Sequence, residues 1–137
     1  RPVGDTDSEA AFCALLNDLR QAFPEPVAVE LFLPSLVAAC AAYRKYGVFN
    51  CLLSDGDWLF SFCSTKLAHI TRRAPFGPAQ LKDADVRVDF QAETTPDDVV
   101  TVLATEPLTD NERWNLYRPG EWRLWRRGEC VAEGLTD

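Results

Sequence analysis

The sequence predicts an α+β fold in which two helices precede a series of mostly antiparallel strands. Apolar residues recur at helical spacing in the first part of the chain, whereas they alternate with polar residues from Val48 onward. Turn sequences, notably Asp55-Gly56 and Arg127-Gly128, separate the alternating stretches. No regular alternation of strand and helix follows, so the pattern argues against a parallel sheet built from βαβ units.

The first helix is expected over residues 8–22. Its single apolar stripe consists of Phe12, Leu15, Leu16, Leu19 and Phe23. Thr6 and Glu9 fit a capping box, in which Thr6 caps the first turn and Glu9 bonds back to the N-cap residue. Such a cap contributes about 1 kcal/mol. Pro24 and Pro26 end this helix because proline lacks the amide hydrogen that a helix interior needs.

A second helix is expected over residues 34–46, with Pro34 in its first turn and Gly47 at its C-terminal stop. Two strands follow at residues 48–53 and 58–64, joined by a tight turn at residues 54–57.

Further strands are expected at residues 68–71, 86–90 and 99–104, and a final hairpin pairs residues 121–126 with 129–133. Residues 72–83 are rich in proline and glycine and predict a loop. Thr109 and Glu112 repeat the Thr-x-x-Glu pattern and predict a short helical turn.

The length of 137 residues and the net charge of −7 favour a single acidic domain, or a large part of one. The acidic balance argues against a nucleic-acid partner, which would require a basic surface. Arg123, Arg126 and Arg127 form a short basic run bracketed by Glu121 and Glu129, which predicts a solvated hairpin surface. No stretch is long and apolar enough to span a bilayer, so no membrane partner is expected.

The cysteines predict free thiols rather than disulfides or a metal site. There are five, an odd number, and each lies in an apolar or alternating stretch: Cys13, Cys40, Cys51, Cys63 and Cys130. They form no Cys-x-x-Cys pair, and one histidine cannot supply a histidine-rich metal site. Buried free thiols are typical of a reducing compartment, so we expect a cytoplasmic protein without a bound metal.

Asp7 is the candidate binding residue. It lies inside the capping sequence, where Thr6 and Glu9 do the capping and Asp7 is left to face outward. A carboxylate at a fixed point on a rigid helix can bind a cationic group of a ligand. An acidic first turn is also common in helices that bind nothing, and on local grounds a simple capped helix is the more frequent interpretation.

Two other pairs of residues have a chemical and a structural interpretation. Asp55 and Asp57 resemble the start of a calcium loop, but the later glycine and glutamate of such a loop are missing, which favours a hairpin turn. Cys63 and His69 allow a cysteine–histidine catalytic pair, but a cysteine in a strand and a lone histidine are more often core residues.

Three tryptophans also allow two interpretations. They are Trp114, Trp122 and Trp125. An aromatic platform for a base or a sugar normally includes interleaved basic residues, which this part of the chain lacks. Packing in the core and in the final hairpin is therefore favoured.

Residues 4–9 (GDTDSE), together with Phe12, resemble the G-x-T-D-S-E…F signature of the class II glutamine amidotransferases, specifically their YafJ-type subfamily. The resemblance continues through further blocks that keep the family order: residues 47–56, 65–67, 104–109 and 112–114 with 119–121. These blocks span nearly the whole chain, and their order makes the resemblance specific.

The resemblance implies an N-terminal-nucleophile hydrolase fold, an αββα sandwich in which two antiparallel sheets stack between two helical layers. Residues 1–137 would form the C-terminal part of that domain. In the family, an N-terminal cysteine attacks the side-chain amide of glutamine, ammonia leaves, and the glutamyl thioester is hydrolysed to glutamate. The family role of the aspartate in the T-D-S-E motif, binding of the substrate α-ammonium, falls on Asp7. No cofactor is implied.

The chain departs from the family pattern because it lacks the leading cysteine and the upstream arginine and Asn-Gly elements. It also begins at Arg1 and contains no methionine, so we expect it to be part of a longer polypeptide. Alone it is expected to be inactive towards glutamine or a related γ-glutamyl amide. A missing N-terminal segment or a second subunit would supply the nucleophile and cover an apolar sheet face. The alternative is a non-catalytic binding or assembly module derived from the same fold.

Overall fold

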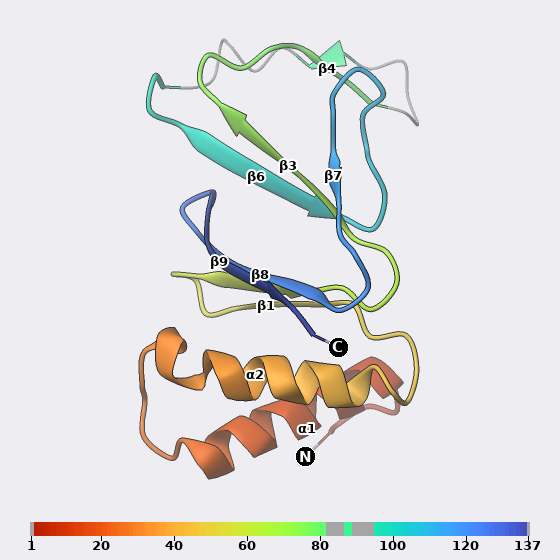
Figure 1. Cartoon of the computed structure of the whole chain (residues 1–137), viewed down its shortest axis with the longest axis vertical. Helices are drawn as coiled ribbons and strands as arrows, with labels where there is room; N and C mark the ends of the chain where they lie inside the picture. The colour runs from red at the N-terminus through yellow and green to blue at the C-terminus, as the bar shows by residue number, and fades with distance from the viewer. Residues whose placement is uncertain (1, 82–86, 89–94, 137) are drawn as a thin grey trace. The chain divides into compact units, whose positions relative to one another are not determined.

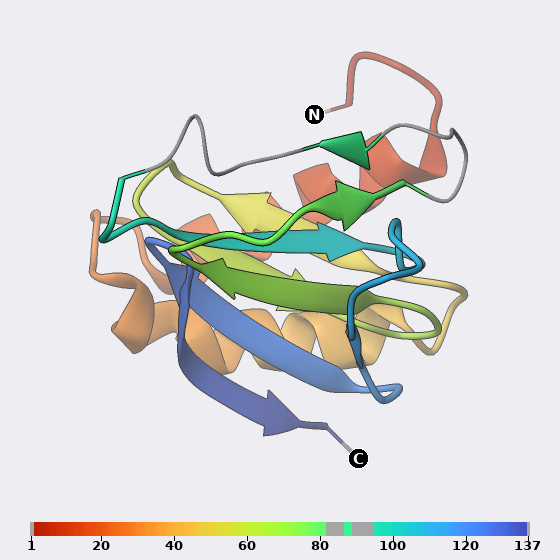
Figure 2. The same cartoon turned by 90° about the horizontal axis from the view of Figure 1, so that it is seen from above.

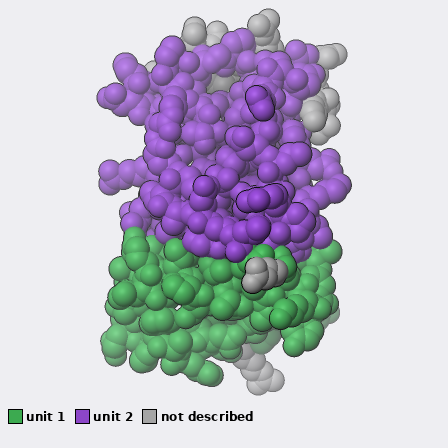
Figure 3. All heavy atoms as spheres, viewed as in Figure 1, with its two compact units in different colours: residues 1–49, 136–137 green, residues 50–135 purple. Residues whose placement is uncertain are grey.

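The computed structural model describes residues 2–81, 87–88 and 95–136 of the chain, of residues 87–88 only the backbone. The chain divides into two compact units, residues 1–49 with 136–137 and residues 50–135 (Figure 3). Within the described residues, no helix is both long and apolar enough to cross a membrane.

The first unit contains two helices, α1 (Asp7–Ala22) and α2 (Val29–Tyr43) (Figure 1). Helix α1 confirms the expected helix to within one residue. It ends before Pro24, where the Phe23 amide donates to the Leu19 carbonyl. The helices contact each other through the Phe23 and Phe32 rings, whose centroids are 6.3 Å apart.

Helix α2 begins five residues before the expected start and ends three residues before the expected end. The prediction that Pro34 lies in the first turn was wrong because the buried face of this helix begins earlier, at Val29, and continues through Leu36 and Cys40. Burial of Val29 outweighs the one backbone hydrogen bond that Pro34 cannot donate inside the helix. The cap is Arg44 in a right-handed conformation, so the helix ends before Gly47.

The first sheet of the second unit has the strand order β1-β2-β8-β9, and all neighbours are antiparallel. Its strands are β1 (Cys51–Ser54), β2 (Leu59–Phe62), β8 (Glu121–Arg126) and β9 (Glu129–Leu135). Both expected hairpins are confirmed. Their turns use the left-handed backbone region, with φ of 101° at Gly56, 48° at Arg127 and 77° at Gly128.

The second sheet has the order β6-β3-β7, and a separate pair is formed by β4 and β5. These strands are β3 (Ala68–Arg73), β4 (Ala79–Gln80), β5 (Arg87–Val88), β6 (Val99–Ala104) and β7 (Asn115–Leu116). β6 agrees with its expected bounds, whereas β4 interrupts the predicted loop and β7 was not predicted. Of the strand expected at residues 86–90, only β5 lies inside the described residues.

The expected helical turn after Thr109 does not form. Residues 110–112 are bends, and Thr109 makes an isolated β-bridge with Leu81. The strand β7 begins three residues after Glu112 and pairs with β3. This part of the chain therefore belongs to the second sheet and not to a helix.

The two sheets of the second unit stack on each other (Figures 1 and 2). A buried cluster between them contains Cys63, Leu67, Tyr117 and Trp125, against which Leu59 and Leu103 pack. Burial of this apolar area, at about 25 cal/mol per Å², is the main force holding the sheets together.

Candidate functional site

The start of helix α1 positions the candidate binding residue. Thr6 has an extended backbone, with φ −79° and ψ 143°, and its hydroxyl oxygen accepts a hydrogen bond of 3.2 Å from the Glu9 amide. Its carbonyl accepts from the Ala10 amide at 3.1 Å. Thr6 is therefore the N-cap residue, as predicted, and fixes the direction in which the helix begins.

Glu9 completes the helix start differently from a standard capping box. Its Oε1 accepts from the Val3 amide at 2.7 Å and its Oε2 accepts from the Gly4 amide at 2.9 Å. In a capping box this carboxylate would accept from the Thr6 amide instead. The prediction was therefore correct for Thr6 and wrong for the partner of Glu9, which reaches beyond the N-cap into the incoming chain.

Asp7 is the first residue of the helix and its side chain is exposed. Its Oδ1 accepts from the Ser8 amide at 2.7 Å and from the Ser8 hydroxyl at 3.4 Å. Among the residues that the structure describes, none donates a hydrogen bond or forms an ion pair with its Oδ2. The positive end of the helix dipole favours a negative charge at this place. The arrangement thus presents one carboxylate oxygen, held on a rigid element, to a cationic group from solvent.

The other residues that the sequence suggested as functional candidates have structural roles. Asp55 Oδ1 accepts from the amides of Asp57 (2.9 Å) and Trp58 (3.2 Å), and chiefly the first of these bonds lowers the pKa of Asp55. This is the hairpin turn that the sequence favoured. In the described part of the chain, no group of three or more histidine, cysteine or acidic side chains is arranged to hold a metal ion.

Cys63 and His69 are both buried in the core between the sheets. Burial raises the pKa of the Cys63 thiol and lowers the pKa of His69, so both are held neutral. The His69 ring packs edge-on against Tyr117 and Trp125, at centroid distances of 5.4 and 5.0 Å. An activated cysteine needs a thiolate or a hydrogen-bonded base. The raised pKa of Cys63 disfavours the thiolate, and among the described residues no hydrogen bond joins Cys63 to His69, whose buried Nδ1 has no partner.

The expectation that all five thiols are buried was wrong for Cys130, which is exposed, and Cys13 and Cys51 are half-buried. None of the five forms a disulfide, which agrees with the prediction of thiols rather than disulfides.

Comparison with known proteins identifies the family. The family model for the class II glutamine amidotransferases matches residues 1–137. The chain belongs to this family. The Escherichia coli protein YafJ, whose name places it among the glutamine amidotransferases, is 54% identical to this chain over 133 residues. The match covers 96% of this chain and 52% of YafJ. A Haemophilus influenzae protein, also named for the glutamine amidotransferases, is 37% identical over 134 residues, covering 97% of this chain and 45% of that protein.

A solved structure is also similar. The crystal structure of a predicted glutamine amidotransferase from Pseudomonas aeruginosa PA01 matches with a TM-score of 0.88 and 74% sequence identity. The match covers 96% of this chain and 52% of that one. The chain therefore spans about half the length of the relatives it matches, and its two helices and antiparallel strands correspond to about half of a class II glutamine amidotransferase structure.

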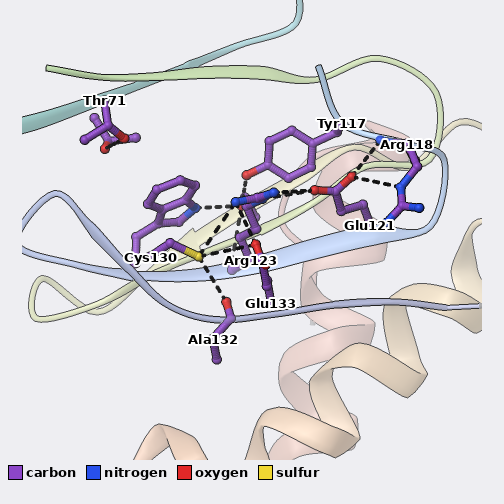
Figure 4. A network of polar contacts seen from close by, with 11 residues as sticks. Thr71, Tyr117, Arg118, Glu121, Arg123, Cys130, Ala132 and Glu133 are labelled. Atoms are coloured by element: carbon purple, nitrogen blue, oxygen red, sulfur yellow. Dashed lines mark hydrogen bonds and ion pairs between the residues drawn. The ribbon is translucent and has the colours of Figure 1, made fainter. Parts of the chain in front are cut away.

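A second polar cluster of this amidotransferase chain was missed by the sequence analysis (Figure 4). Arg123 was expected on a solvated surface, but its side chain is only 21% exposed and lies between two carboxylates. Its Nη2 is 2.8 Å from Glu121 Oε1 and its Nη1 is 2.7 Å from Glu133 Oε2. The guanidinium also lies over the Tyr117 ring, 5.5 Å from its centroid.

Both carboxylate oxygens of buried Glu121 are hydrogen-bonded: Oε2 accepts from the Arg118 amide and Oε1 accepts from Arg123, each at 2.8 Å. Burial acts to raise its pKa, but hydrogen bonds from the Arg118 amide and Arg123, and the charges of both arginines, hold the pKa below its usual range. The available signal was the strand alternation, which places Arg123 on the same face as Trp125, two residues later, and that tryptophan is buried.

The same cluster continues through Tyr117, whose hydroxyl lies 2.8 Å from Ser61 Oγ, while the Trp125 indole donates to Ser61 Oγ at 3.0 Å. Burial raises the pKa of Tyr117 to about 12, which keeps it neutral. Trp122 packs instead on Phe60, and Trp114 donates to Thr109 at 2.8 Å. Each indole serves a different place in the fold, as the packing interpretation predicted.

Proposed function

We propose that this chain is the C-terminal part of an enzyme that hydrolyses the side-chain amide of glutamine, or of a related γ-glutamyl amide. The complete domain of that enzyme would have the αββα sandwich fold of the N-terminal-nucleophile hydrolases. The observation that carries the proposal is the exposed Asp7 carboxylate, at the position of the aspartate in the T-D-S-E motif and with Oδ2 free of described partners.

In this proposal the nucleophile is an N-terminal cysteine outside this chain. Its thiolate attacks the amide carbonyl, the amide nitrogen takes up a proton and leaves as ammonia, and a glutamyl thioester remains. Water then cleaves the thioester to glutamate and restores the thiol. Asp7 binds the α-ammonium of the substrate through a charge-assisted hydrogen bond and thereby orients the amide.

The test compares two substrates in the full-length protein. Glutamine carries the α-ammonium, whereas glutaramate has the same amide and carboxylate without the amino group. Asp7→Asn is expected to raise KM for glutamine about 10- to 100-fold, which corresponds to a hydrogen bond between charged groups. Hydrolysis of glutaramate is expected to change little, and ammonia release is the measurement.

Asp5→Asn is the matched control, because Asp5 is an exposed aspartate two residues away in the loop before the helix. The chain alone is expected to release no ammonia from glutamine. A full-length protein that leaves glutamine intact would contradict the proposal and favour the non-catalytic binding or assembly module. An Asp7→Asn variant with unchanged KM would contradict the binding role proposed for Asp7.

A further inference from the structure

We infer that Glu9 is a positioning residue for Asp7: its carboxylate holds residues 3–6 in place, so that Asp7 meets the substrate ammonium in one fixed orientation. The inference rests on the proposed function, because it assumes that Asp7 binds an ammonium group. Two observations support it: the hydrogen bonds that Glu9 accepts from the Val3 and Gly4 amides, and the close approach of the Glu9 carboxylate to Gly4.

Glu9 makes two short hydrogen bonds to consecutive amides of the chain before the helix, 2.7 Å to Val3 and 2.9 Å to Gly4. Both carboxylate oxygens are used, one for each amide, which fixes the orientation of this segment as well as its distance. Neither amide belongs to the helix, whose first turn is already capped by Thr6. The bonds therefore stabilise the approach to the helix rather than the helix itself.

Little else holds this segment. Residues 2–8 are exposed, and the Val3 side chain is 99% exposed, so apolar packing does not order it. Within the described part of the chain, the two bonds to Glu9 are the only hydrogen bonds that residues 2–5 make. Without them, the chain that leads into Thr6 and Asp7 would be free to take other conformations.

Gly4 adds a consequence of the same contact. A Cβ atom built on Gly4 would collide with Glu9 Oε2, the end of a flexible side chain, so Glu9 would have to move away from the two amides. Because φ of Gly4 is not in the left-handed region, the requirement here is for space and not for backbone freedom. Gly4 and Glu9 therefore act as one unit, in which the small residue allows the carboxylate to reach the two amides.

The experiment measures kcat and KM of the full-length protein for glutamine and glutaramate. Glu9→Gln keeps the shape of the side chain but replaces one acceptor oxygen by a donor, which faces an amide hydrogen. It is expected to raise KM for glutamine about 10-fold, with kcat changed less than about 2-fold. Glutaramate hydrolysis is expected to stay within about 2-fold of the wild type because this substrate has no ammonium to orient. Glu25→Gln, at another exposed glutamate of the same unit, is the control.

A double-mutant cycle tests whether Gly4 and Glu9 act as one unit, with circular dichroism as the check that each variant is folded. Gly4→Ala is expected to raise KM for glutamine about 10-fold in the wild type, but to have no further effect in a Glu9→Ala background, where the collision is gone. Independent, multiplying effects of the two substitutions would overturn the inference.

Two other outcomes would also overturn it. If Glu9→Gln impairs glutamine and glutaramate equally, Glu9 has only a general structural role. If Asp7→Asn removes the preference for glutamine but Glu9→Gln leaves it intact, the proposed function stands and the positioning role is wrong. If Asp7→Asn leaves the preference intact, the proposed function fails first and this inference falls with it.

Discussion

Residues 6–9 and 109–112 carry the same pattern, Thr-Asp-x-Glu, but only the first begins a helix. At the first, the Thr6 side chain accepts from a backbone amide, and Glu9 bonds two further amides. Among donors on described residues, the side chains of Thr6 and Glu9 therefore accept hydrogen bonds only from backbone amides close by in the chain.

At the second, side chains bond side chains. Thr109 donates to Glu112 Oε2 and accepts from the Trp114 indole, both at 2.8 Å. Glu112 also receives two hydrogen bonds from Arg72, of 2.7 and 2.6 Å. Thr109 is buried, and the side chains of Arg72 and Glu112 are only 15% and 16% exposed.

A capping pattern therefore specifies a helix only where no stronger hydrogen-bond partner competes for the capping side chains. An arginine 40 residues away offers Glu112 a bidentate, partly buried ion pair, which is stronger than a bond to a neutral amide. The chain after Glu9 also continues as an apolar helical stripe, whereas the chain after Glu112 soon enters strand β7.

The largest effect is expected for Glu112→Ala. It leaves Arg72 partly buried without its carboxylate, and we expect the free energy of unfolding to fall by about 3 kcal/mol. Glu106→Ala is the control, because its pair with Lys66 is 69–72% exposed and is worth at most about 1 kcal/mol. Urea denaturation of the full-length protein followed by tryptophan fluorescence measures both, and all four tryptophans of this chain lie in residues 50–135. Equal losses for the two variants would contradict the comparison.

A matched pair of substitutions tests the two threonines directly. Thr109→Val removes a buried hydroxyl and leaves the Trp114 indole without its acceptor, so we expect a loss of about 2 kcal/mol in the free energy of unfolding. Thr6→Val removes an exposed N-cap and is expected to cost about 1 kcal/mol. Amide hydrogen exchange separates them, because Thr6→Val should speed exchange in the first turn of α1 only. A larger global loss for Thr6→Val would show that the cap, and not the buried network, dominates.

The smallest effect is a change in acid sensitivity. The hydrogen bond from Arg72 is the main cause that holds the pKa of Glu112 below its ordinary value of 4.5. A carboxyl with a lowered folded-state pKa stabilises the fold above pH 4.5, and that contribution is lost as pH falls through the folded-state pKa. Glu112→Gln should therefore flatten the loss of stability below pH 4.5 relative to a Glu106→Gln control. An unchanged slope, measured by urea denaturation at several pH values, would rule out this contribution.

Several elements could be predicted because their signals lie within a few residues. Thr6 and Pro24 delimit α1, and the Asp55-Gly56 and Arg127-Gly128 turns define two hairpins through residues that tolerate left-handed backbone. The motif around Asp7 likewise indicated the family, which the family model confirms. The binding role of Asp7 stays a prediction.

Other features were predicted wrongly because local charge and proline signals were given more weight than burial. Arg123 was assigned to the surface, since its local neighbours are charged, but the fold places it between Glu121 and Glu133 and over the Tyr117 ring. The start of α2 was misplaced because Pro34 was given more weight than the burial of Val29.

The sequence by itself determined α1 to within one residue, the turns of the two hairpins, and that Asp7 lies on a capped helix in a class II glutamine amidotransferase pattern. Turns and caps depend on contacts between residues close in the chain, so their signals are local. Only the tertiary structure decided that Glu112 binds Arg72, which is 40 residues away in the sequence, whereas Glu9 binds Val3 and Gly4 close by in the chain. A carboxylate binds the strongest donor that the folded chain brings near it, and which donor that is depends on packing rather than on the local pattern.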